Sequence, residues 1–212
     1  MVGRGILCVR WRVTAAEPPL VWRYCRRCDA EQAFRCAGKF RTNFQKKRID
    51  VWLIYRCAAC DQTWNLPVYE RCRIGDVGQA GFEALCRNAP DLVRRVAMDA
   101  RWLARQGNRV VPCGDVHVEK SLLGRPVAKP DGIELRLVAE QAVGVRLDRL
   151  LAQRLNLPRA SIRRLAKAGG LSVDPGGSGA LRRGLKGPVT VTIDLEAAAS
   201  ALRPELVSAA LE

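Results

Sequence analysis

The chain has 212 residues, 48% of them hydrophobic and 27% charged, which suits one or two packed domains and excludes a disordered chain. Its 36 Lys and Arg residues outnumber its 21 Asp and Glu residues by 15, so the net charge favours a polyanionic partner, nucleic acid first of all. No apolar run reaches the roughly 18 residues that a bilayer span needs, and arginines in the N-terminal stretch argue against a membrane span and a signal peptide.

The positive charge gathers in two segments. Residues 1–75 carry 15 basic and 6 acidic side chains and residues 145–195 carry 10 and 3, whereas the residues between them are nearly neutral. We therefore expect an α+β chain of four segments. These are a β module over 1–75, a central segment of helices and short strands over 76–142, a basic αα-β module over 143–195, and an Ala-rich tail over 196–212 that forms a covering helix.

Alternating apolar residues predict a strand over residues 6–13 and, after Pro18 and Pro19, a second strand over residues 20–24. The chain contains nine cysteines, an odd number that argues against a secreted disulfide framework. The cysteines are instead expected to be reduced thiols that hold a metal. Because thiols stay reduced in the cytoplasm, we expect a cytoplasmic protein.

Two Cys-x-x-Cys pairs, Cys25 with Cys28 and Cys57 with Cys60, flank a strand-like stretch over residues 50–56. Each pair can bend into a knuckle that presents two thiolates, and two knuckles complete a tetrahedral Cys₄ shell. Soft thiolates favour Zn²⁺, with an iron–sulfur centre or a redox dithiol as alternatives. A shell of four protein ligands leaves no position for a catalytic water, so we expect a structural ion.

The 28 residues between the pairs include a basic stretch that also contains Phe40 and Phe44; its cations are Lys39, Arg41, Lys46, Lys47 and Arg48. Basic groups can contact phosphates while aromatic rings stack on bases, which predicts a grip on single-stranded nucleic acid. The stretch can equally be a solvated β-hairpin whose Phe side chains point into the core.

Apolar residues three and four apart predict two amphipathic helices within residues 82–103, separated by Pro90, with Gly107 and Asn108 ending the second. Strands are predicted over residues 110–118 and 133–138, because Gly and Pro cluster between them.

A distinctive motif surrounds the second cysteine pair. It comprises Phe40-Arg41-Thr42-Asn43, the residues from Asp50 to Cys57, Cys60-Asp61, Thr63-Trp64-Asn65 and Arg71. It resembles an uncharacterised bacterial family catalogued as domain of unknown function 1062, over roughly residues 20–105. The resemblance supports a zinc ribbon and implies no reaction.

Two short helices are predicted after Val145. The first has an apolar stripe that leaves Arg146 and Arg149 to one side; the stripe is Leu147, Leu150, Leu151 and Leu155. Asn156 suits a left-handed C-cap and Pro158 the first turn of the second helix. That helix directs Ile162, Leu165 and Ala166 to the core, and strands follow over residues 171–173 and 189–195.

This order of elements, with Arg146-Leu147-Asp148 and Gly169-Gly170-Leu171-Ser172-Val173, resembles the small RNA-binding domain of ribosomal protein S-four over residues 143–195. In place of that family's Asn-Gly turn the chain has residues 174–177, Asp-Pro-Gly-Gly. The resemblance implies an RNA-facing helix with neighbouring cations; the residues concerned are Arg159, Arg163, Arg164, Lys167, Arg182, Arg183 and Lys186.

Together these patterns predict a non-catalytic, zinc-containing protein that binds structured RNA, such as ribosomal or transfer RNA. One histidine, His117, and the lack of any recognised catalytic motif argue against an enzyme. A DNA-binding transcriptional regulator is the alternative, since zinc ribbons and basic helices also serve DNA binding. An RNA-modifying enzyme would need a cluster of carboxylates between Glu83 and Asp115.

Overall fold

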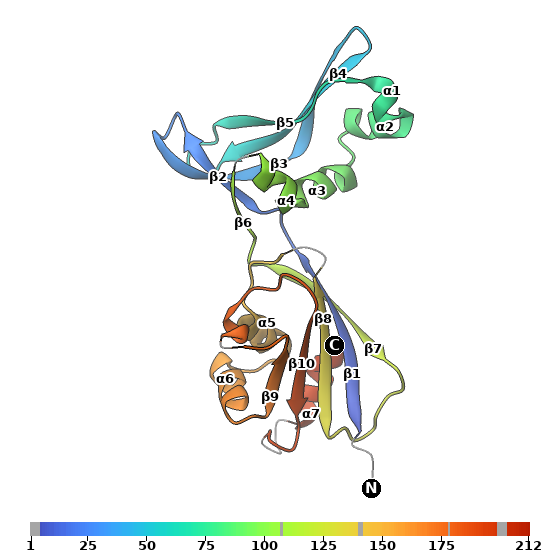
Figure 1. Cartoon of the computed structure of the whole chain (residues 1–212), viewed down its shortest axis with the longest axis vertical. Coiled ribbons are helices and arrows are strands. Elements are labelled where there is room, and N and C mark those ends of the chain that lie inside the picture. Colours follow the sequence, from blue (N-terminus) through green and yellow to red (C-terminus); the bar gives the residue numbers. More distant parts are fainter. Residues whose placement is uncertain (1–4, 107, 140–141, 178, 199–202) are drawn as a thin grey trace. The chain divides into compact units, whose positions relative to one another are not determined.

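The computed structural model describes residues 5–106, 108–139, 142–177, 179–198 and 203–212. The chain forms two compact units, each with its own sheet (Figure 1). We call Glu17–Cys113 the cysteine unit, and we call Met1–Ala16 together with Gly114–Glu212 the terminal unit. This division differs from the expected four segments, because the N-terminal strand joins the C-terminal residues and the expected central segment is shared between the units.

The cysteine unit contains a five-stranded sheet in the order β5-β4-β3-β2-β6, with every neighbouring pair antiparallel. Its strands are β2 (Leu20–Cys25), β3 (Ala30–Gln45), β4 (Arg48–Cys57), β5 (Thr63–Arg73) and β6 (Arg109–Val111). In β4, Ile49, Val51, Leu53 and Tyr55 are fully buried, whereas Asp50 and Trp52 between them are half-buried. Side chains alternate across a strand, so one face of this sheet forms the core.

Four helices follow the long strands of the cysteine unit; they are α1 (Ile74–Val77), α2 (Gln79–Cys86), α3 (Pro90–Met98) and α4 (Ala100–Arg105). Leu85, Val93, Ala97 and Leu103 from these helices pack in one core with the buried residues of β4. Pro90 opens α3, as its position in the sequence predicts, because proline suits the first helical turn. Gly107, the expected end of the second helix, lies outside the described residues.

The terminal unit contains a second five-stranded sheet, in the order β7-β1-β8-β10-β9. Its strands are β1 (Ile6–Ala15), β7 (Val116–Leu123), β8 (Gly132–Ala139), β9 (Leu171–Asp174) and β10 (Val189–Asp194). β1 and β8 are parallel, and the other neighbouring pairs are antiparallel. The strand expected over residues 110–118 is therefore wrong as one element: β6 and β7 lie in different sheets, and Pro112 between them cannot donate to a ladder.

Helices pack on one face of this second sheet; they are α5 (Leu147–Arg154), α6 (Arg159–Lys167) and α7 (Arg203–Leu211), with a short 3₁₀ turn, η1 (Ala180–Arg182). Leu150, Leu151 and Ile162 lie in one core with the alternate residues of β1, β8 and β10. Asn156 adopts a left-handed conformation with φ 55° between α5 and α6, as expected for the C-cap.

The tail forms part of the terminal core. The indole Nε1 of the fully buried Trp11 donates a hydrogen bond of 3.0 Å to the carbonyl oxygen of Ala210 in α7. The expected covering helix is therefore present over Arg203–Leu211, while residues 199–202 of the Ala-rich tail lie outside the described residues. Within the part of the chain that is described, no helix is long and apolar enough to cross a bilayer.

Candidate metal centre and nucleic-acid interface

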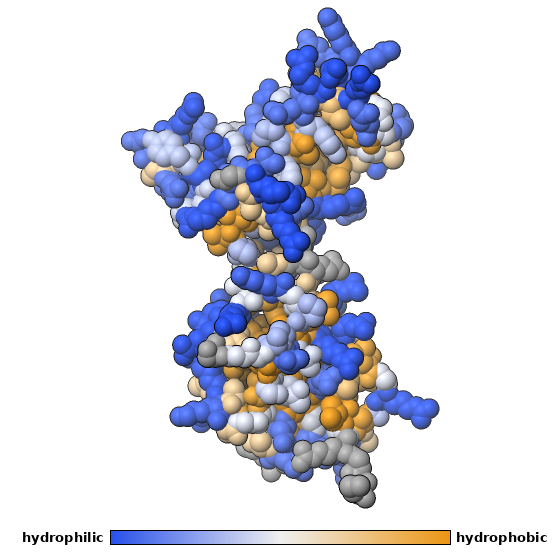
Figure 2. Space-filling model, viewed as in Figure 1, coloured by the Kyte–Doolittle hydropathy of each residue, from blue (hydrophilic) through white to orange (hydrophobic). Residues whose placement is uncertain are grey.

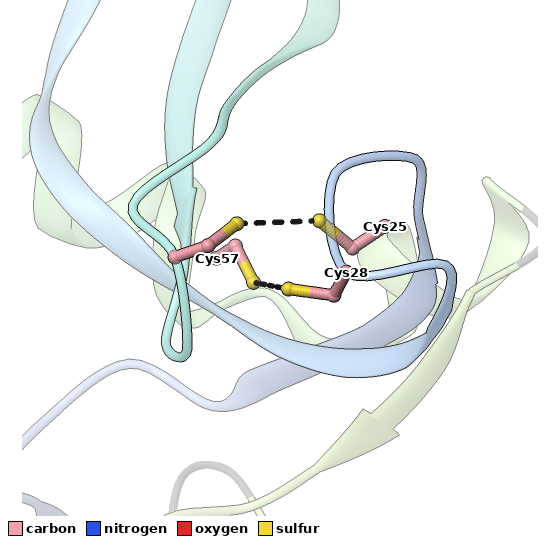
Figure 3. A group of neighbouring side chains, drawn as sticks. Cys25, Cys28 and Cys57 are labelled. Carbon is pink, nitrogen blue, oxygen red and sulfur yellow. Dashed lines mark hydrogen bonds between the residues drawn. The ribbon is translucent and has the colours of Figure 1, made fainter.

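The four cysteines of the two Cys-x-x-Cys pairs meet at one end of the cysteine-unit sheet (Figure 3). Cys25 ends β2 and Cys57 ends β4, and the turn after each strand carries Cys28 and Cys60. The Sγ atoms of Cys25 and Cys60 are 3.6 Å apart, those of Cys28 and Cys57 are 3.9 Å apart, and all four Sγ atoms lie within 4.8 Å of one another. These four thiols can hold a metal ion.

An aspartate follows each knuckle in a left-handed conformation, Asp29 with φ 53° and Asp61 with φ 62°. Aspartate tolerates this conformation better than most residues, which lets the chain reverse and enter the next segment. The Asp61 carboxylate also binds Arg35 and Arg56 at 2.9 and 3.2 Å. Both cysteine pairs are followed by aspartate, and this repeated Cys-x-x-Cys-Asp pattern could have predicted the two chain reversals from the sequence.

The pKa values of the cluster thiols shift in opposite directions. Burial acts to raise the pKa of Cys25, but hydrogen bonds from the backbone N–H groups of Cys28 and Arg27 and from neighbouring thiols outweigh it and lower this pKa to about 7. The Cys60 thiol and burial raise the pKa of Cys28 to about 12. A cation that binds here must therefore displace protons from the cluster.

The basic stretch between the cysteine pairs forms the β3–β4 hairpin. Its cations Lys39, Arg41, Lys46, Lys47 and Arg48 are all exposed, and Figure 2 shows hydrophilic residues gathered at the tip of the hairpin. Lys46 and Lys47 form the turn with φ values of 47° and 64°. Phe40 is buried in the core, as expected for a solvated hairpin. Phe44 is 45% exposed and packs edge-on against Phe82, with ring centroids 5.2 Å apart.

Three arginines of the terminal unit surround one buried carboxylate, that of Asp148 on α5. Arg146 Nη2 lies 3.2 Å from Asp148 Oδ2, Arg159 Nη2 lies 3.1 and 3.0 Å from the two oxygens, and Arg163 Nη2 lies 2.9 Å from Oδ2. Asp148 is fully buried, while the three arginine side chains are 42–50% exposed. We call these four residues the Asp148 cluster; three cations around one anion leave it with a net positive charge.

The cluster also fixes the charge of its carboxylate. Burial acts to raise the pKa of Asp148, but hydrogen bonds from Arg159 and Arg163 and the positive charges of Arg159 and Arg146 hold this pKa below its ordinary value. Helical spacing in the sequence predicts that the arginines share one face. It does not predict the role of Asp148, because Asp148 on α5 meets Arg159 and Arg163 on α6 only once the two helices have packed together.

The remaining predicted cations of the terminal unit are not members of the Asp148 cluster. Arg149, Arg164, Lys167, Arg183 and Lys186 are exposed, and Arg164 Nη2 donates to Ser161 Oγ at 3.2 Å. Arg182 lines one cavity with Asp148 and Arg163, about 440 Å³ in volume. Arg183 and Lys186 line a second cavity beside Leu147 and Pro175, about 660 Å³ in volume. The structure thus brings Arg146, Arg159, Arg163 and Arg182 to one region.

The carboxylate cluster expected for an RNA-modifying enzyme is not found among the described residues. Glu83 lies on α2 of the cysteine unit and accepts a hydrogen bond of 2.7 Å from Gln79, whereas Asp115 belongs to the terminal unit. Across the described ranges, the four cysteines are the one group of three or more His, Cys, Asp or Glu side chains close enough to hold an ion.

No curated protein and no solved structure matches the chain. The expected likeness of residues 143–195 to the domain of ribosomal protein S-four therefore stays a prediction. A family model does match residues 42–176, a range that includes Cys57, Cys60 and the Asp148 cluster but begins after Cys25 and Cys28. The chain belongs to the family described as protein of unknown function, DUF1062.

Proposed function

We propose that this protein is a non-catalytic, zinc-containing RNA-binding protein that contacts structured RNA through the terminal unit. The observation that carries the proposal is the Asp148 cluster, in which one buried carboxylate orients three half-exposed guanidinium groups. A phosphate oxygen accepts the N–H donors of arginine in the same geometry as a carboxylate oxygen.

The cluster keeps donors available for such a contact. A guanidinium has five N–H donors, and the hydrogen bonds to Asp148 occupy one nitrogen of Arg146, one of Arg159 and two of Arg163. Side chains already held in place lose less conformational entropy when they bind a ligand. Lys167 lies one helical turn beyond Arg163 on α6 and is exposed, so it extends the cationic row along this helix.

RNA suits these groups better than the major groove of DNA. A-form RNA is recognised mainly through its backbone, its 2′-hydroxyl groups and its shape, which cationic donors of this kind can contact. The resemblance of residues 143–195 to the RNA-binding domain of ribosomal protein S-four supports the same partner.

Zn²⁺ is the ion that we propose for the four cysteines. A tetrahedral site with Zn–S bonds of about 2.3 Å places its sulfur atoms roughly 3.8 Å apart. The distances of 3.6 and 3.9 Å between paired Sγ atoms agree with that geometry. Four thiolate ligands leave the ion structural, and it would tie the ends of β2 and β4 together in the cysteine unit.

Fluorescence anisotropy with the intact, zinc-loaded protein tests the RNA-binding proposal. The probes are a labelled RNA stem-loop and a DNA duplex of equal length. We expect tighter binding of the stem-loop, and we expect the double variant Arg159→Gln/Arg163→Gln to weaken it by roughly tenfold or more, since each lost phosphate contact costs binding energy.

Arg125→Gln is the matched control, because Arg125 is an exposed arginine of the same unit that lies outside the Asp148 cluster. It should bind the stem-loop as the wild type does. Equal affinity of the wild type and the double variant would refute the proposal, and a preference for the DNA duplex would favour a DNA-binding regulator instead.

A further inference from the structure

The sheet of the cysteine unit has a second face, opposite the one whose residues share a core with the helices. The core helices pack on the face that contains Val51, Leu53 and Tyr55, so Trp52, Ile54 and Arg56 of β4 lie on the opposite face. Across the ladders Trp52 pairs with Arg41 of β3, Ile54 with Asn65 of β5, and Arg56 with Thr63 of β5. Paired residues share a face, so cations, an amide and an apolar side chain come together here.

A cavity of about 470 Å³ beside an irregularity in the sheet is lined by five of these six residues, Arg41, Ile54, Arg56, Thr63 and Asn65. The pairing of β3 with β4 shifts its register between Cys36 and Phe40, around Gly38, whose φ is 72°. The Phe40 N–H at the end of this irregularity donates to Asn88 Oδ1, and both residues belong to the lining of the cavity. Bulges of this kind often lie beside binding sites, because they redirect side chains at an otherwise regular sheet.

The lining of the cavity combines an apolar side chain, Ile54, with a polar one, Asn65. Ile54 is only 6% exposed yet belongs to neither hydrophobic core, so it provides an apolar surface inside the cavity. Beside it, Oδ1 of Asn65 is buried and has no hydrogen-bond partner among the described residues. An amide oxygen accepts hydrogen bonds and cannot donate them, so the partner that this buried atom lacks is an N–H or O–H group.

The lining also contains three cations, Lys39, Arg41 and Arg56, and it contains no acidic residue. Arg56 uses Nη1 for its ion pair with Asp61, at 3.2 Å, which holds the guanidinium in place and leaves its other donors. The Arg41 guanidinium lies 6.0 Å from the centre of the Trp52 ring. An anionic group is therefore favoured at the cationic side of the cavity, next to the apolar Ile54 and the unpartnered Asn65 Oδ1.

We infer that this cavity binds a nucleoside phosphate. The phosphate contacts Lys39, Arg41 and Arg56, the planar base lies against Ile54, and an N–H group on the edge of the base donates to Asn65 Oδ1. Cytosine and adenine carry such a group as an exocyclic amine. A volume of about 470 Å³ lies in the range of small-ligand pockets. The same chemistry is offered by a free nucleotide and by one unpaired nucleotide of single-stranded RNA.

Calorimetric titration of the intact, metal-loaded protein tests the inference, with CMP, AMP and inorganic phosphate as ligands. We expect either nucleotide to bind at least about tenfold more tightly than phosphate, because only the nucleotide adds the base contacts. Asn65→Leu should weaken nucleotide binding by about tenfold and leave phosphate binding unchanged, since it removes the side-chain amide and keeps the three cations. Arg41→Gln should weaken both.

Arg101→Gln is the control, because Arg101 is an exposed arginine of the same unit on α4, which packs on the other face of the sheet. It should bind every ligand as the wild type does. Binding of phosphate as tightly as of the nucleotides, unchanged binding by Asn65→Leu and Arg41→Gln, or no binding of any ligand would each overturn the inference. Metal content and circular dichroism confirm that each variant is folded, and Arg41 is exposed, so its replacement should not disturb the core.

A short single-stranded oligocytidine distinguishes the two sources of the ligand. Tighter binding of the oligonucleotide than of CMP assigns the cavity to unpaired RNA, an outcome that rests on the proposed function, whereas equal or weaker binding assigns it to a free nucleotide. The variant Arg159→Gln/Arg163→Gln should lose stem-loop binding but keep the affinity for CMP. The two proposals can therefore fail separately.

Discussion

Arg163 on α6 holds the carboxylate of Asp148 on α5 through two of its nitrogens, with Nε at 3.2 Å and Nη2 at 2.9 Å from Oδ2. The contact joins the two helices of the terminal unit, and it buries the acid while half of the arginine side chain stays accessible to solvent. An ion pair of this kind has two consequences, one for stability and one for ligand binding.

Asp148→Asn should weaken RNA binding although it raises the net charge by one. The amide cannot neutralise Arg146, Arg159 and Arg163, so the three guanidinium groups repel one another and lose their common orientation. We expect affinity for the RNA stem-loop to fall by about tenfold and the free energy of unfolding to fall by about 1–3 kcal/mol. Anisotropy and urea unfolding measure the two effects.

Glu119→Gln is the charge-matched control, since it removes an exposed carboxylate of the same unit outside the cluster. It should leave the free energy of unfolding nearly unchanged. If Asp148→Asn bound RNA more tightly than Glu119→Gln, the carboxylate would be only a competitor of the phosphate and not the group that orients the arginines.

The stability that Asp148 provides should disappear in acid. Its folded-state pKa is lower than the ordinary value of 3.8, so its contribution to stability is fully present above that value and is lost as the pH falls through the lowered pKa. The difference in unfolding free energy between the wild type and Asp148→Asn should be constant from about pH 7 to pH 5 and shrink below about pH 4. Urea unfolding at a series of pH values measures it, and a difference that grows in acid would contradict the sign.

Removal of the metal should unfold the cysteine unit and spare the terminal unit. Cys25 and Cys57 lie in the core of the cysteine unit, and structural Zn²⁺ sites provide apparent binding energies of about 10–16 kcal/mol near neutral pH. Mass spectrometry should find one ion per chain. After chelation, hydrogen exchange should lose protection in residues 17–113 and keep it in residues 114–212.

Cys57→Ser should reproduce the effect of the chelator, whereas Cys86→Ser should bind the ion normally, because Cys86 is exposed on α2 and outside the cluster. An ion retained by Cys57→Ser with full protection of residues 17–113 would show that the four thiols do not form the site.

Trp11→Phe should loosen α7. It removes the hydrogen bond from Nε1 to the carbonyl oxygen of Ala210 and leaves space around a fully buried position, so we expect a loss of about 1–3 kcal/mol in unfolding free energy. Limited proteolysis should cut the C-terminal helix faster. Leu211→Ala is the comparison, since Leu211 is 40% exposed and its truncation should have little effect on either measurement.

The sequence by itself determined the features that depend on near neighbours. The spacing of Cys25 with Cys28 and of Cys57 with Cys60 predicted the cluster of thiols, because two residues between cysteines are enough to bend a knuckle. Helical periodicity predicted α5 and α6, and Asn156 marked the turn between them through its own backbone preference.

Only the tertiary structure decided which distant segments meet. The alternation of apolar residues in β1 suits any sheet with one buried face, so the sequence does not reveal that β1 pairs with β7 and β8 of the terminal unit. Phe40 and Phe44 carry the same side chain on one face of β3, and their places along the hairpin settle that Phe40 is buried in the core and that Phe44, beside the turn, is exposed. Asp148 acquires its role in the same way, because its partners Arg159 and Arg163 reach it only after two helices have packed against each other.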